Sequence, residues 1–135
     1  MTHPLVRRIF TAVFLVSMPL VVAASCNFTD KVCKAGEDCA CTSAGICRLS
    51  CDGPECSFSC ASPGQCDFDC PDGKCHANCS SSGSCTMACP GNDCTMACSG
   101  TGSCELTACT KGCSLTCNVT GSCEQTCTDP SCTTR

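Results

Sequence analysis

The chain has 135 residues, of which 23 are cysteine and none is tryptophan or tyrosine, and a formal net charge of −4. One domain is expected at this length, and the absence of any run of Lys or Arg disfavours a nucleic-acid or anionic-membrane partner. Large apolar residues are too scarce after position 24 to offset the ordering entropy by burial alone, which excludes a conventional hydrophobic core.

Residues 1–24 have the pattern of an export signal. Arg7 and Arg8 give a positive start, residues 9–20 are almost wholly apolar, and residues 22–24 are small enough for cleavage. The apolar run is shorter than the roughly 20 residues that a membrane-spanning helix requires. We therefore expect a signal peptide at 1–24 and a secreted or cell-surface/envelope protein, in an oxidising compartment where cysteines form disulfides.

Cys26 lies directly after the small residues that end this segment. The number of cysteines is odd, so they cannot all pair within one chain. The context of Cys26 resembles the site at which bacterial lipoproteins are cut before a cysteine that then receives lipid. Lipidation of Cys26 is one hypothesis, and that lipid would be the protein's only membrane contact. The alternative is that Cys26 or Cys132 is a free thiol or links two chains.

Residues 25–46 contain unevenly spaced cysteines. Cys39-Ala40-Cys41 is a shortened form of the pattern that dominates the rest of the chain. Because terminal repeats are usually atypical, this segment is expected to be an irregular, cysteine-rich N-terminal cap.

Residues 47–135 repeat one short pattern, a cysteine followed four residues later by another. The turns between these patterns alternate between four and five residues, so that the full unit is 19 residues long, as Cys51, Cys70 and Cys89 show. The turns are rich in Gly, Pro, Asn, Asp and Ser, which interrupt regular structure. A fixed period of this size predicts a stacked repeat array.

Each pattern is expected to be a β-strand, because the two cysteines and the residue midway between them then share one face. The midway residues fall into two walls: Leu49, Phe68, Met87, Leu106 and Gln125, and Phe58, Ala77, Met96 and Leu115. The prediction is an all-β, small disulfide-rich repeat protein, a narrow β-solenoid with two short strands per 19-residue coil. The alternative is a series of hairpins clipped into small lobes. One extra residue between Cys104 and Cys109 predicts a β-bulge.

The cysteines of the array are expected to form structural disulfides rather than zinc sites, because an exported chain meets an oxidising environment. Their pairing is left open. These cysteines are Cys47, Cys51, Cys56, Cys60, Cys66, Cys70, Cys75, Cys79, Cys85, Cys89, Cys94, Cys98, Cys104, Cys109, Cys113, Cys117, Cys123 and Cys127.

The repeat style behind an export signal resembles that of uncharacterised cysteine-rich exported proteins of myxobacteria. The narrow coil, with cysteines inside and Thr, Ser and Ala outside, is similar to the disulfide-filled solenoids of insect antifreeze proteins. Those proteins have shorter coils and a regular Thr-x-Thr ladder. The resemblance implies an extracellular structural class and no particular chemistry.

No catalytic, cofactor-binding or metal-binding residue is predicted, and no cofactor is expected. His76 is the only histidine after the signal, and no set of acid, base and nucleophile forms around it. Asp67 and Asp69 share an outward face and offer oxygen ligands to calcium. Arg48 lies one coil earlier in the same column, so an ion pair is the better interpretation.

Three functions remain open. The leading hypothesis is an exported, non-enzymatic structural or interaction protein with an unknown extracellular or envelope partner. The alternative is ice binding, suggested by Thr95, Ser114, Thr116 and Thr133, although His76 and Asn78 interrupt the row. The further alternative, a cysteine-rich metal-binding protein, requires free thiols.

Overall fold

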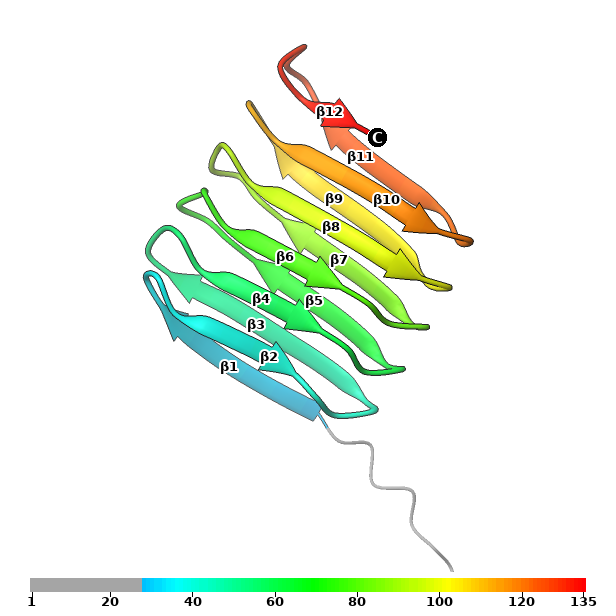
Figure 1. Cartoon of the computed structure of the whole chain (residues 1–135). Helices are drawn as coiled ribbons and strands as arrows, with labels where there is room; N and C mark the ends of the chain where they lie inside the picture. The colour runs from blue at the N-terminus through cyan, green and yellow to red at the C-terminus, as the bar shows by residue number, and fades with distance from the viewer. Residues whose placement is uncertain (1–27) are drawn as a thin grey trace, which may run out of the picture.

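The computed structural model describes residues 28–135, which wind into a parallel β-solenoid (Figure 1). The expected signal peptide and Cys26 lie outside the described residues. Within the described part of the chain, no helix is long and apolar enough to cross a bilayer.

The solenoid has two six-stranded sheets, and the chain passes from one to the other at every turn. The odd-numbered sheet contains β1 (Phe28–Lys34), β3 (Ile46–Asp52), β5 (Gln65–Asp69), β7 (Ser84–Ala88), β9 (Ser103–Cys109) and β11 (Cys123–Cys127). The even-numbered sheet contains β2 (Asp38–Cys41), β4 (Ser57–Cys60), β6 (His76–Cys79), β8 (Thr95–Gly100), β10 (Ser114–Val119) and β12 (Thr133–Thr134).

The pairing confirms the predicted solenoid with two strands per coil. Every strand pairs in parallel with the strand two places along the chain, for example β3 with β5 and β4 with β6. Hairpins would pair consecutive strands in antiparallel fashion. The alternative of small hairpin lobes is therefore wrong.

The two predicted walls are also confirmed. Phe68 pairs with Leu49 on one side and Met87 on the other, and all three side chains are 2% exposed or less. The walls meet at the centre of the coil, where the rings of Phe58 and Phe68 stack with their centroids 5.0 Å apart. Cysteines fill the rest of this interior.

The predicted β-bulge lies in β9. In the strand register, Gln125 of β11 lies opposite Leu106, but Cys127 lies opposite Cys109. Between these two register positions, β9 therefore contains one residue more than β11. Ala108 takes a positive φ of 56° there. The extra residue is absorbed locally, and the register of the following coil is kept.

The segment expected to be an irregular cap forms, from Phe28 onward, a coil in register with the rest. In the strand register, Cys33 lies opposite Cys51, and Cys41 lies opposite Cys60. The difference lies at the open end of the wall, where the exposed Lys31 occupies the position that Leu49 fills in the next coil. The ammonium of Lys31 lies 2.7 Å from the Glu37 carboxylate, and this hydrogen bond lowers the pKa of Glu37.

The other end of the interior is polar as well. Gln125 occupies the last position of the wall that contains Leu106, and Thr134 occupies the last position of the wall that contains Leu115. The Thr134 hydroxyl donates a hydrogen bond to Gln125 Oε1 over 2.7 Å. Polar or charged residues pointing inward at the ends of a sheet discourage another chain from adding a strand.

The five-residue turns stack on one another through a column of glycines. A methyl group on Gly83 would overlap the carbonyl oxygen of Gly64 in the coil before, and the same holds for Gly102 on Gly83. Only glycine lets the two backbones approach this closely.

The substitution Gly83→Ala is therefore expected to destabilise the protein by about 3 kcal/mol, because backbone atoms must move to admit the methyl group. Ser82→Ala is the matched control, since Ser82 is an exposed residue of the same turn and its loss should cost less than about 0.5 kcal/mol. Guanidinium unfolding midpoints of the oxidised proteins provide the measurement. Similar midpoints for both variants would contradict the close stacking of the turns.

Candidate binding face

The outward side chains of the even-numbered sheet form two rows. Inward residues such as Phe58 alternate with outward ones, and the parallel register places equivalent residues of successive coils about 4.8 Å apart. One row contains Asp38, Ser57, His76, Thr95, Ser114 and Thr133. The other contains Ala40, Ser59, Asn78, Ala97 and Thr116.

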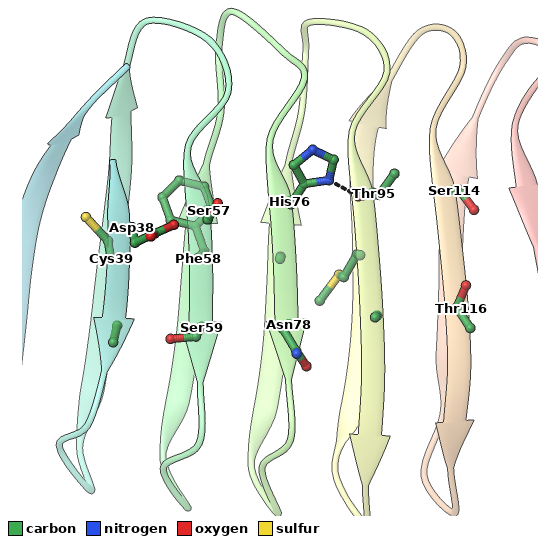
Figure 2. A pocket seen from close by; sticks show the side chains of 14 residues that line it. Asp38, Cys39, Ser57, Phe58, Ser59, His76, Asn78, Thr95, Ser114 and Thr116 are labelled. Atoms are coloured by element: carbon green, nitrogen blue, oxygen red, sulfur yellow. Dashed lines mark hydrogen bonds between the residues drawn. The ribbon is translucent and has the colours of Figure 1, made fainter. Parts of the chain in front are cut away.

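This surface, which we call the even face, contains mostly small side chains. Figure 2 shows the side chains of Ser59, His76, Asn78 and Thr116 projecting from neighbouring strands. A shallow pocket runs across the strands and includes both rows from Asp38 to Thr116. No Asp, Glu, Lys or Arg lies in either row between Ser57 and Thr116. The even face thus presents hydroxyl, amide and methyl groups with little charge.

Hydrogen bonds connect neighbouring coils along the first row. His76 Nδ1 contacts the hydroxyl of Thr95, and the hydroxyl of Thr133 donates to Ser114 over 3.2 Å. These bonds fix side-chain positions on the surface.

His76 is itself exposed, as the sequence predicts. That the chain is not an enzyme stays a prediction.

The outward face of the odd-numbered sheet is acidic. It contains Asp67, Asp69, Glu105 and Glu124, and Arg48 Nε lies 3.4 Å from Asp67 Oδ2. The predicted ion pair is therefore confirmed. The Asp67 carboxylate also accepts hydrogen bonds from the Gln65 amide. These contacts engage both carboxylate oxygens of Asp67, one of the two residues that offered ligands to calcium.

Disulfides close every turn between consecutive strands of the described chain. Eleven bonds each join a cysteine at or near the end of one strand to a cysteine at or near the start of the next. All the array cysteines expected to be structural are in these bonds.

Sequence reasoning left four further cysteines out of that set: Cys33, Cys39, Cys41 and Cys132. Two of them follow the 19-residue period, since Cys41 precedes Cys60 by one period and Cys132 follows Cys113 by one period. This spacing could have revealed them. The alternative in which Cys132 is the leftover thiol is wrong, because Cys132 is bonded to Cys127.

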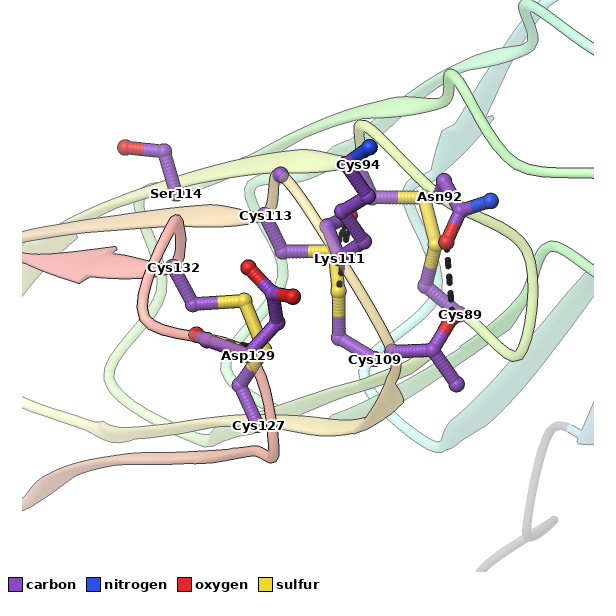
Figure 3. Close-up of a disulfide and its surroundings, with 12 residues drawn as sticks. Cys89, Asn92, Cys94, Cys109, Lys111, Cys113, Ser114, Cys127, Asp129 and Cys132 are labelled. Atoms are coloured by element: carbon purple, nitrogen blue, oxygen red, sulfur yellow. Dashed lines mark hydrogen bonds between the residues drawn. A yellow bond between two sulfur atoms is a disulfide. The ribbon is translucent and has the colours of Figure 1, made fainter.

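The disulfides stack into two ladders, one along each edge of the solenoid. Figure 3 shows part of one ladder, in which Cys89–Cys94, Cys109–Cys113 and Cys127–Cys132 close equivalent turns of successive coils. Metals bind thiolates, whereas these sulfurs are bonded to each other. A metal-binding role for the described cysteines would thus require prior reduction.

Comparison with known proteins identified no relative of this chain. No protein-family model, no curated protein and no solved structure matches this chain.

Proposed function

We propose that this protein is an exported, non-enzymatic rod that presents its faces to an extracellular or envelope partner. The observation that carries the proposal is the closure of every turn between described strands by a disulfide. Disulfides persist in oxidising compartments, which supports export. A chain fixed at each corner also holds its outward side chains at constant spacing, which favours binding to an ordered or repetitive surface.

The even face is the better candidate for contact with that partner. Its rows carry hydroxyl and amide groups that form hydrogen bonds without the desolvation cost of charges. The acidic face is better suited to solvent, because carboxylates such as Glu105 and Glu124 lie opposite each other on paired strands and repel a second acidic surface.

We further propose that a lipid on Cys26 tethers the rod to a membrane. Every cysteine from Cys33 to Cys132 already has a partner within that range, which supports a separate role for Cys26. One residue, Asn27, lies between Cys26 and Phe28, the first residue of β1. The tether would therefore hold the first coil close to the membrane and leave the faces of later coils accessible.

The proposal is tested by expressing the full chain in a bacterium and analysing cell fractions, the intact mass and the free thiols. The expected product is found outside the cytoplasm, begins at Cys26, carries added lipid and has no titratable thiol. A product that begins at Ser25 without lipid would contradict the tether alone. A reduced product retained in the cytoplasm would contradict export and with it the proposed role.

Ice binding is a second candidate, favoured by the nearly uncharged, regularly spaced rows of the even face. Thr95→Lys would place a charged, flexible side chain within the first row, whereas Glu105→Lys changes the opposite face. If the even face binds ice, the unmodified protein should shape ice crystals and depress their growth temperature. Thr95→Lys should abolish both effects and Glu105→Lys should preserve them. Absence of any effect in the unmodified protein would exclude this candidate.

A further inference from the structure

The ladder that closes the five-residue turns brings sulfurs of different bridges together. Cys60–Cys66, Cys79–Cys85 and Cys98–Cys104 belong to three successive coils. The sulfur of Cys85 and both sulfurs of Cys60–Cys66 lie within 4.8 Å of one another, and the same holds for Cys79 with Cys98–Cys104. The middle bridge therefore has one sulfur beside each neighbouring bridge.

Two buried serines lie beside one of these contacts. Ser62 and Ser81 are the buried polar residues of the described chain, at 3% and 6% exposure. Ser81 Oγ lies 3.7 Å from Cys85 Sγ, and Ser62 Oγ lies 3.8 Å from both Cys60 Sγ and Cys66 Sγ. The equivalent position in the next coil is Gly100, so no hydroxyl accompanies Cys98–Cys104 in the same way.

We propose that Ser62, Ser81 and the bridges Cys60–Cys66 and Cys79–Cys85 form an internal thiol–disulfide exchange site. The thiolate is the attacking species in such exchange, and a hydroxyl donor stabilises it. Ser81 is placed to stabilise a thiolate on Cys85, the attacking sulfur. Ser62 is placed to stabilise the thiolate released from Cys60 or Cys66.

The exchange itself needs no oxidant or reductant once the Cys85 thiol is free. The Cys85 thiolate attacks Cys66 Sγ, a Cys66–Cys85 bond forms and the Cys60–Cys66 bond breaks. The bonding electron pair goes to Cys60 Sγ, which is then protonated. Attack on Cys60 releases Cys66 in the same way. The number of disulfides is unchanged, so that the free thiol moves by one coil.

An intact chain enters this sequence when an external monothiol opens Cys79–Cys85. The monothiol forms a mixed disulfide with Cys79 and releases the Cys85 thiolate. The four cysteine residues of Cys60–Cys66 and Cys79–Cys85 are at most 2% exposed, so an inner thiol meets its neighbouring bridge more readily than it meets solvent. Damage to one bridge can then spread to neighbouring coils or be reversed.

The test uses Cys79→Ser, which leaves Cys85 without its partner from the start. The full-length variant is incubated at pH 8, quenched in acid, unfolded and labelled with a thiol reagent, and the label is located by mass spectrometry. Label is expected first on Cys85 and then, within hours, also on Cys60 and Cys66. Ser62→Ala in this background should slow the transfer about tenfold, because the released thiolate loses a hydrogen-bond donor. Label confined to Cys85 at every time would overturn the proposal.

Cys85→Ser is the matched control, since it leaves Cys79 beside Cys98–Cys104, where no serine occupies position 100. Label should reach Cys98 and Cys104 about tenfold more slowly than it reaches Cys60 and Cys66 in the first variant. Equal rates in the two directions, or no effect of Ser62→Ala, would show that the serines only fill the turns. Should Cys79→Ser fail to fold, Cys98→Ser leaves Cys104 beside Cys79, and the expected transfer is to Cys85. Its absence there would equally overturn the proposal.

Discussion

Reduction of the disulfides is expected to abolish the solenoid at room temperature. Each bridge spans only four to six residues in sequence, as Cys109–Cys113 and Cys60–Cys66 show. Closing a loop of this size in the unfolded chain contributes about 2 kcal/mol on the chain-entropy model. Eleven such bridges contribute on the order of 20 kcal/mol. This exceeds the roughly 5–15 kcal/mol of net stability typical of a folded domain.

Far-ultraviolet circular dichroism with and without excess reductant provides the measurement. The β-sheet signal should be lost as thiols appear and should return on reoxidation. An equal concentration of the oxidised form of the reductant is the control for solvent effects. Retention of the β-sheet signal in a fully reduced, alkylated sample would show that the inner walls alone hold the fold.

Phe68→Ala is expected to cause the largest loss of stability among single substitutions in the walls, about 3–5 kcal/mol. Phe68 is 2% exposed, packs between Leu49 and Met87 and stacks on Phe58. The disulfides fix the corners on either side of β5 at Cys66 and Cys70, so the coil cannot collapse into the space left behind.

Asp69→Ala is the control for this substitution, because Asp69 is exposed on the same strand and points to the opposite side. Its effect should stay within about 0.5 kcal/mol. Both variants are unfolded with guanidinium in their oxidised form, after intact mass has confirmed full bridging. Comparable shifts of the two midpoints would mean that the inward and outward residues of β5 have been assigned wrongly.

The repeat made the architecture predictable. A period of 19 residues combined with alternation of side chains was enough to align Leu49 with Phe68 and to place Phe58 in the opposite wall. The bulge in β9 was predictable for the same reason, since one surplus residue stands out against a constant spacing. The even face followed directly, because its residues are the outward positions of the same strands.

The disulfide pairing was not predictable from spacing. An inward cysteine such as Cys85 has sulfurs of its own coil and of the adjacent coil nearby, so several partners satisfy the same pattern. The regular coil formed by the residues after Phe28 was not evident from the sequence, because the cysteines there are unevenly spaced. Lys31 also fills a wall position where an apolar residue is expected, a substitution that is tolerated at an end of the stack. Ser62 and Ser81 are indistinguishable in the sequence from ordinary turn residues, because serine is common in turns and their burial depends on coil stacking.

The polar residues at both ends of the interior allow the number of coils to change without exposing a new apolar end. Lys31 ends one wall at the N-terminal end of the stack, and Gln125 and Thr134 end the two walls at the C-terminal end. The coils between these ends stack on one another in the same parallel register. Duplication or deletion of one 19-residue unit in the gene would therefore lengthen or shorten the rod by about 4.8 Å and leave both ends intact. The length of such a protein can therefore change during evolution in fixed steps of one coil, while each turn keeps its disulfide.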